Sequence, residues 1–165
     1  MTLQEGMLRF DFTGAIRAFK FDEENHMSTN FHGLSHCMKA VDFIVEYENY
    51  YIFIEIKDPP DPSRYETEKD KTELINNLVV KFRDTFLYRW AEKRLDKPVY
   101  YQCLVELDNA QTLYIMNQLK NQLPAERRPS RWKQSLVKAC MVANVVTWNK
   151  NFPNMQVKRI TGVIP

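Results

Sequence analysis

Acidic and basic side chains stand at both ends of one apolar stretch, residues 40–58. Asp42 opens this stretch, and Glu55 and Lys57 close it after two runs of β-branched and aromatic residues separated by a polar turn. Side chains alternate across a strand, so Glu55 and Lys57 share one face. Charges in so apolar a setting are unfavourable unless they are paired, hydrated or bound to a metal. The pattern predicts a β-hairpin that carries a charged site.

These residue types suit the hydrolysis of phosphodiesters. Carboxylate oxygens are ligands for hard cations such as Mg²⁺ or Mn²⁺, which bind through one or two protein carboxylates together with phosphate oxygens. Such a metal lowers the pKa of its bound water and neutralises charge on the phosphate. A lysine beside the metal can orient the attacking water or stabilise the developing charge. Asp42, Glu55 and Lys57 are therefore our candidate catalytic residues.

Asp42 followed by Glu55-x-Lys57 at the end of the next strand resembles the PD-(D/E)xK, or restriction-endonuclease-like, nuclease superfamily. The resemblance rests on these three motif residues, within an order of elements that covers residues 14–107. It implies that Asp42 and Glu55 bind a divalent metal, with the Ile56 carbonyl as a further candidate ligand, and that Lys57 serves the water or the phosphate. The family usually places another acidic residue on its first helix. The candidates for that role are Asp22, Glu23 and Glu24.

The remaining elements predict the α/β class, with a central mixed β-sheet flanked by helices on both faces and a restriction-endonuclease-like core in a single domain, 1–165. Strands are expected at 41–46, 51–57, 99–107, 136–146 and 155–160, and helices at 14–24, 72–93 and 108–123. A long helix separates the strands 51–57 and 99–107, so we expect these two to run parallel. The stretch 25–40 reads as loop, although the resemblance calls for a strand there.

The helix at 72–93 has two distinct faces. One carries an apolar stripe that should face the core, formed by Leu74, Leu78, Phe82, Phe86 and Trp90. Another carries Asn77, Lys81, Asp84 and Tyr88, and we take Lys81 as a candidate for binding substrate phosphate. The competing interpretation of this face is a solvated helix surface. On the helix at 108–123 the residues expected to point inward are Leu113, Met116 and Leu119.

A basic segment follows that helix. Its members are Arg127, Arg128, Arg131, Trp132 and Lys133. Four cations around one tryptophan suit a phosphate backbone and a stacked base. The alternative is a solvated loop whose tryptophan anchors it to the core.

Other signals bound the function. Only four glycines occur, and no glycine-rich phosphate-binding motif is present. The histidines and cysteine between residues 26 and 37 fit zinc-site spacing poorly, so we interpret them as loop residues. Three widely spaced cysteines indicate no disulfide framework, which favours a reducing compartment. No apolar run approaches the length of a membrane span.

The sequence thus predicts a cytoplasmic, metal-dependent nuclease that uses Mg²⁺ or Mn²⁺ and has no membrane association. DNA is favoured over RNA as the substrate because the resembled family mostly cuts DNA, and the same resemblance suggests a role in defence against foreign DNA. So small a nuclease is expected to form a homodimer or to work as a subunit of a larger complex. The alternative is a catalytically inactive nuclease-like subunit that binds nucleic acid or a protein partner.

Overall fold

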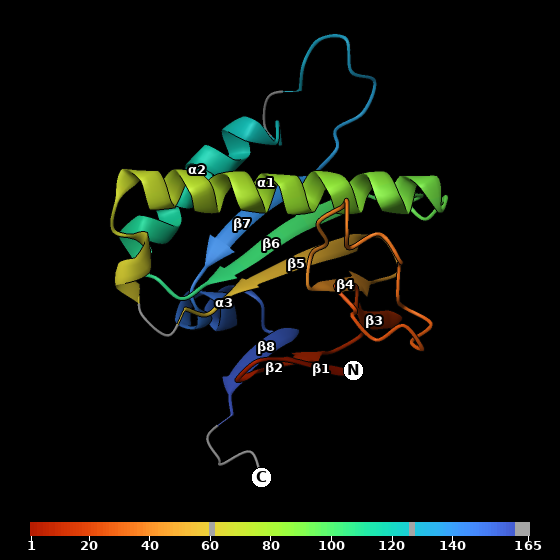
Figure 1. The fold of residues 1–165 in the computed structure, drawn as a ribbon, viewed down its shortest axis with the longest axis horizontal. Coiled ribbons are helices and arrows are strands. Elements are labelled where there is room, and N and C mark those ends of the chain that lie inside the picture. Colours follow the sequence, from red (N-terminus) through yellow and green to blue (C-terminus); the bar gives the residue numbers. More distant parts are fainter. Residues whose placement is uncertain (60–61, 126–127, 161–165) are drawn as a thin grey trace.

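Two β-sheets and the helices that cover them make up the computed structural model, which describes residues 1–59, 62–125 and 128–160 (Figure 1). Within these residues the elements are β1 (Thr2–Glu5), β2 (Leu8–Phe12), β3 (Arg17–Lys20), β4 (Phe43–Glu46), β5 (Tyr51–Lys57), the 3-10 helix η1 (Pro62–Tyr65), α1 (Glu68–Ala91), β6 (Val99–Val105), α2 (Asn109–Gln122), β7 (Ala139–Ala143), α3 (Val145–Asn151) and β8 (Met155–Arg159). The predicted α/β class with a mixed sheet flanked by helices is confirmed, but the expected helices on both faces are not, because a small sheet covers most of the second face.

The larger sheet has the strand order β3-β4-β5-β6-β7. Its first three strands are antiparallel, and β4 and β5 form the predicted hairpin with Phe43 opposite Ile54. From β5 onward the strands run parallel, because α1 and α2 provide the crossover connections. The predicted strand-helix-strand unit is therefore confirmed, and the carboxyl ends of β5, β6 and β7 lie at one edge of the sheet.

The helices α1 and α2 cover one face of this sheet (Figure 1). Leu74, Leu78 and Phe82 of α1 are buried as expected, but Trp90 is 63% exposed. A spacing of four residues advances about 40° beyond a full helical turn, so a stripe of five such positions drifts off the core by about 160°. The helices within the described residues all lack the stretch of apolar residues that spanning a bilayer requires.

On α2 the buried positions differ from the prediction. Leu113 is exposed, whereas Thr112, Ile115 and Leu119 are buried. Leu119 is buried as predicted, whereas Thr112 and Ile115 lie one position before the predicted Leu113 and Met116. The predicted start of the helix is correct, because Asp108 is the N-cap and its carboxylate accepts a hydrogen bond from the Gln111 N–H.

The opposite face of the large sheet is covered mainly by the small sheet, whose order is β1-β2-β8, together with α3. An aromatic cluster joins the layers, since Phe10 of β2 packs edge-on against both Phe43 of β4 and Trp148 of α3. The Trp148 indole N–H donates to the Met155 carbonyl, which ties α3 to β8. The chain therefore closes the second face with strands from its two distant ends.

The helix predicted for residues 14–24 is wrong. This region contains β3, which pairs antiparallel with β4 from Arg17 opposite Glu46 to Lys20 opposite Phe43. Gly14 has a φ of 76°, a left-handed turn that breaks any helix begun at Thr13. Pairing with an already buried strand then outweighs a weak local helix preference. Residues 25–40 lie outside the described helices and strands, as the sequence indicated.

Candidate active site

Four segments of chain bring charged side chains together at the carboxyl end of β5. Asp22 lies just after β3, Asp42 just before β4, Glu55 within β5, and Lys81 in the middle of α1. The backbone pairing of β3 and β4 continues past their ends, because the Phe21 N–H donates to the Asp42 carbonyl at 2.8 Å. This pairing sets Asp22 beside Asp42. Glu55 faces α1, since it lies on the same side of β5 as the buried Phe53.

Asp42 is held by the backbone of β5. The backbone pairing of β4 with β5 ends at Phe43 and Ile54. The next N–H of β5 that points toward β4 is that of Ile56, and it donates to Asp42 Oδ2 at 2.6 Å. One carboxylate oxygen is thereby fixed, and Oδ1 is directed at Lys81. The carbonyl of a residue in an extended strand points to the same side as its N–H, so the Ile56 carbonyl faces the same edge.

Glu55 is fully buried and carries two ammonium partners. Its Oε1 lies 2.7 Å from Lys57 Nζ and 2.8 Å from Lys81 Nζ. Its Oε2 is also buried and has no hydrogen-bond partner among the described residues. Removing a carboxylate from water is costly unless its oxygens are satisfied, so an oxygen without a partner marks a place where a further ligand is favourable.

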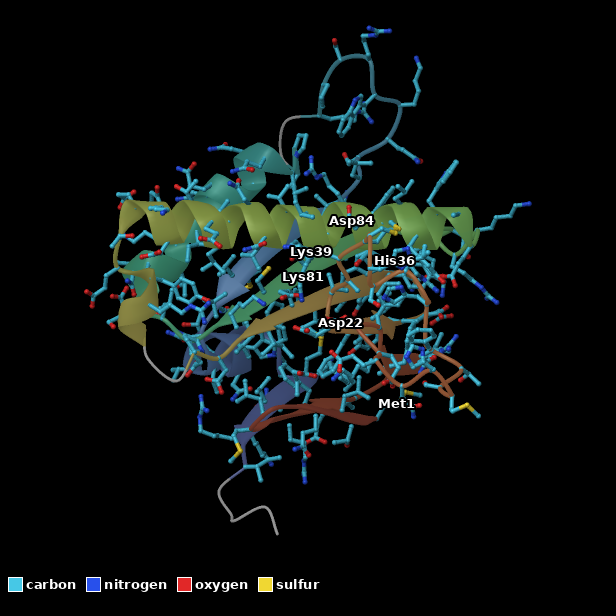
Figure 2. The ribbon with its side chains drawn as sticks, in the orientation of Figure 1. Met1, Asp22, His36, Lys39, Lys81 and Asp84 are labelled. Atoms are coloured by element: carbon cyan, nitrogen blue, oxygen red, sulfur yellow. The ribbon has the colours of Figure 1, made fainter. Side chains whose placement is uncertain are left out.

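The Lys81 ammonium is the point on which the carboxylates converge. Its Nζ lies 2.8 Å from Glu55 Oε1, 3.6 Å from Asp22 Oδ2 and 3.7 Å from Asp42 Oδ1. Figure 2 shows Lys81 extending from α1 with Asp22 on the side away from the helix. Three acidic side chains from three segments therefore surround a single cation.

Two of these groups have shifted pKa values. Burial, and then the charge of Glu55, raise the pKa of Asp42 to about 7, against the opposing effect of Lys81. Burial alone would lower the pKa of Lys81, but Glu55, Asp42 and Asp22 outweigh it and raise that pKa to about 12. Lys81 is thus charged at neutral pH, and Asp42 changes its charge near neutrality.

A pocket of about 410 Å³ adjoins the cluster. Lys57 and Lys81 line it, whereas Asp22, Asp42 and Glu55 do not. The other charged residues in its wall are Lys39, Arg64, Asp70 and Glu73. The two lysines therefore stand between this pocket and the cluster of Asp22, Asp42 and Glu55. Four cationic residues contribute to the pocket wall, and one of them, Lys81, directs its ammonium to these carboxylates.

The polar face of α1 is a packing surface against residues 32–42, which corrects its interpretation as a solvated surface. Asp84 Oδ2 accepts from the Lys39 N–H at 2.9 Å, and Asn77 Oδ1 accepts from Lys39 Nζ at 2.8 Å. The buried Thr85 hydroxyl accepts from the Val41 N–H at 3.0 Å. These contacts hold the segment that ends in Asp42 along the helix. Lys39 and Asp84 are labelled in Figure 2.

Of the three acidic candidates near residue 22, the structure brings only Asp22 to the cluster. It reaches Lys81 from the end of a strand and not from a helix. Glu24 is exposed, and the Glu23 carboxylate accepts a local hydrogen bond from the Asn25 N–H. Spacing alone left these three neighbours equivalent, because the choice depends on where β3 ends against β4.

The basic segment is placed away from the carboxylates. It precedes β7, and β7 is parallel to β5, so Arg128, Arg131 and Lys133 lie toward the amino ends of the strands whereas Lys57 lies at a carboxyl end. In Figure 1 it forms the loop between α2 and β7 at the top of the view. Trp132 is partly exposed, and Arg128 donates to the Lys133 carbonyl. Arg127 lies outside the described residues.

The interpretation of the histidines as loop residues agrees with their contacts. The His32 ring stacks on Phe21, and its Nδ1 accepts from the Leu34 N–H. Within the described residues no group of three His, Cys, Asp or Glu side chains has the spacing of a metal site as the side chains now stand. In this structure the carboxylates of Asp22, Asp42 and Glu55 are spaced around the ammonium of Lys81.

Sequence reasoning missed two cations of the pocket, Lys39 and Arg64. Lys39 lies in a stretch without secondary-structure signals, and Arg64 follows a proline-rich loop, so neither had a predicted neighbour. Lys39 could have been proposed from the sequence, because it precedes Asp42 by three residues and so lies next to the same hairpin.

Comparisons of the chain with protein-family models, with curated proteins and with solved structures gave no match.

Proposed function

We propose that this protein is a metal-dependent nuclease that hydrolyses phosphodiester bonds of nucleic acid. The observation that carries the proposal is the convergence of Asp22, Asp42 and Glu55 on one cation position, with Lys57 on the same glutamate and a pocket lined by cations beside it. A pair of buried carboxylates, Asp42 and Glu55, with a third beside them has no evident structural purpose, because an apolar core of similar volume is as stable or more so.

The fold supports the resemblance to restriction-endonuclease-like enzymes. Asp42 and Glu55 lie on adjacent strands of a hairpin, and a helix and a parallel strand follow. The strand that the resemblance requires near the hairpin has a counterpart in β3, which is the neighbour of β4. We infer a restriction-endonuclease-like core on this basis.

The donors fit a hard divalent cation by chemical type. Asp42 Oδ1 and the unpartnered Glu55 Oε2 would hold it, with Asp22 and the Ile56 carbonyl at the same edge. A bound Mg²⁺ or Mn²⁺ would supply a water of lowered pKa and would neutralise charge on the phosphate. The remaining contributions come from the protein.

Lys57 has the position required for the charge-stabilising role. Its ammonium is anchored 2.7 Å from Glu55 Oε1, and its side chain is 28% exposed where it lines the pocket. A phosphate held in the pocket would contact the Lys57 ammonium at the part of the pocket wall next to the carboxylates. Its charge matters more in the transition state than in the ground state, since negative charge builds on the phosphoryl oxygens during attack.

Cleavage assays with matched variants test the proposal. Supercoiled plasmid and a labelled single-stranded oligonucleotide would be incubated with Mg²⁺ or Mn²⁺ and the wild type, Glu55→Gln, Lys57→Ala or Lys150→Ala. Lys150 is an exposed lysine of α3, so its variant controls for a change in net charge. We expect the first two variants to lose on the order of 10²-fold or more in rate, the range for a charge-stabilising group, while Lys150→Ala keeps full activity. Equal cleavage by all four proteins would contradict the proposal.

One observation favours the second candidate, a catalytically inactive subunit that keeps the fold. Lys81 and Lys57 already serve as cationic partners of the carboxylates, so the cluster has counter-charges without a metal. Wild-type protein that binds nucleic acid or a protein partner, but neither binds Mn²⁺ in calorimetry nor cleaves any substrate, would establish this alternative. The preference for DNA, the assembly into a homodimer or larger complex, and a role in defence stay predictions from the resemblance.

A further inference from the structure

Lys81 separates two chemically different compartments. On one side its ammonium contacts Asp22, Asp42 and Glu55, which do not line the pocket. On the other side its side chain forms part of the wall of that pocket. Only 15% of the side chain is exposed, so an ion that enters from the pocket meets Lys81 and Lys57 before it meets Asp42 or Glu55.

Lys81 uses the same carboxylates as the proposed metal. Asp42 Oδ1, which would bind the metal, lies 3.7 Å from Lys81 Nζ, and Lys81 also contacts Oε1 of Glu55, whose Oε2 would bind the metal. A divalent cation such as Mg²⁺ binds oxygens at about 2.0–2.1 Å, closer than any contact Lys81 makes here. Lys57 and Lys81 share Glu55 Oε1 in this structure, but a doubly charged ion beside them would repel the Lys81 ammonium about twice as strongly as Lys57 does at equal distance. The carboxylates therefore serve one of the two cations at a time.

We infer that Lys81 is an exchangeable counter-ion, which leaves the carboxylates when a divalent cation binds and moves its ammonium into the pocket as a ligand for an oxyanion. This inference rests on the proposed function, because it assumes that the carboxylates take a metal. It assigns the pocket to a phosphate group and makes the binding of metal and of phosphate mutually favourable.

The pocket provides for the released ammonium. A lysine side chain is flexible and carries a compact charge, so Lys81 can change rotamer without any movement of α1. Lys39, Lys57 and Arg64 already line the pocket, and Lys39 is held in place by Asn77. Asp70 and Glu73 also line it and offset part of the positive charge until a ligand enters. A fourth cation in the pocket would then favour a doubly charged tetrahedral anion.

Chemical labelling of wild-type protein tests the exchange directly. Acetic anhydride would be applied with and without saturating Mg²⁺, and the modification of each lysine measured by mass spectrometry. We expect Lys81 to be protected without Mg²⁺ and to react at least about fivefold faster with it, as a group released from a buried pair to solvent. Lys97, which is paired with Glu46 and the Tyr47 carbonyl, is the internal control and should not change. Unchanged or slower labelling of Lys81, under conditions where calorimetry shows bound Mg²⁺, would overturn the inference.

Binding of sulfate, a soluble stand-in for phosphate, provides the second test. Calorimetry would compare wild type, Lys81→Met and Lys39→Ala, each with and without Mg²⁺. We expect Lys81→Met to weaken sulfate binding roughly tenfold with Mg²⁺ and to leave it unchanged without Mg²⁺, whereas Lys39→Ala weakens it in both conditions. Equal loss for Lys81→Met in both conditions would mean that Lys81 always faces the pocket, and the exchange would be wrong.

The affinity of the metal itself should also change. Lys81→Met should bind Mn²⁺ roughly tenfold more tightly or better, the factor for a site whose competent state is populated at about a tenth. If Lys81→Met fails to fold, labelling of the wild type still decides the question. Failure of the proposed function has a different outcome: wild type that binds no Mn²⁺, with labelling of Lys81 unaffected by any divalent ion.

Discussion

At the scale of single residues, the molecule keeps three acids and two lysines together, and two of the acids, Asp42 and Glu55, are buried. The balance among them depends on Asp42, which is 8% exposed and has a pKa of about 7. The charge of Asp42 is thus unfavourable in the folded protein, even though Lys81 and the Ile56 N–H support it. Catalytic and binding groups commonly have pKa values displaced in this way, and the displacement affects stability as well.

Asp42→Asn should increase the free energy of unfolding relative to wild type, and this gain should grow as the pH rises. The folded-state pKa of Asp42 is raised from 3.8 to about 7, so between these values the folded state binds more protons than the unfolded state and stability falls with increasing pH. Asparagine keeps an oxygen for the Ile56 N–H and removes this contribution. The difference in unfolding free energy between variant and wild type should grow by about 3 kcal/mol from pH 5 to pH 8, measured by urea denaturation at both pH values.

Glu48→Gln, at an exposed carboxylate in the turn between β4 and β5, is the control for this experiment and should follow the wild-type profile. A difference for Asp42→Asn that shrinks toward pH 8 would show that Lys81 stabilises the Asp42 charge by more than burial disfavours it.

At the scale of elements, α1 positions the site through its polar side chains as much as through its apolar stripe. Asn77, Asp84 and Thr85 hold the irregular segment that leads into Asp42, and Lys81 then reaches the carboxylates from the same helix. A segment without regular structure needs such partners, because its backbone groups have no ladder to satisfy them.

Thr85→Val should destabilise the protein by about 1–3 kcal/mol, since it leaves the Val41 N–H buried without an acceptor while preserving shape. Thr85→Ser keeps the hydroxyl and should recover most of the loss. Thermal and urea denaturation of both variants would measure the effect, and cleavage rates would report whether Asp42 has moved. Equal stability of the valine variant and the wild type would mean that the Val41 N–H finds another acceptor.

Elements with local signals were predictable, and those fixed by distant partners were not. The hairpin, α1, β6 and the N-cap of α2 each follow from alternation, helical period or a capping residue within a few positions. β3 was predicted as a helix because its pairing with β4 lies more than twenty residues away. Asp42, Glu55 and Lys57 were placed together correctly by the hairpin, whereas the choice of Asp22 and the central position of Lys81 depend on how four segments pack.

At the scale of the whole molecule, two candidate contacts with nucleic acid lie at opposite edges of the large sheet. The carboxylate cluster is at the carboxyl end of β5, and the basic segment leads into the amino end of β7. A strand the length of β5, seven residues, spans about 23 Å. No single phosphate can touch both regions, so they would act on one nucleic acid only if it crosses the sheet.

A triple variant of the basic segment, Arg128→Ala with Arg131→Ala and Lys133→Ala, should therefore affect long duplexes selectively. With a rise of about 3.4 Å per base pair, a duplex needs about seven base pairs to reach from one edge to the other. We expect weaker binding and a flatter salt dependence for a 16-base-pair duplex and no change for a 6-base-pair one, measured by fluorescence anisotropy. Unchanged affinity for the long duplex would assign the segment to the plain surface of the protein.

The pairing of β2 with β8 has a consequence for how the protein is made. β2 is the central strand of the small sheet, but its second neighbour is Met155–Arg159, near the end of the chain. During synthesis on the ribosome the apolar side chains of β2, including Phe10 and Phe12, must wait for that strand while the large sheet already exists. Arg159 then forms a bidentate pair with Asp58, the residue after Lys57. The nascent chain thus completes the surroundings of β5 only after residues 155–159 have been translated.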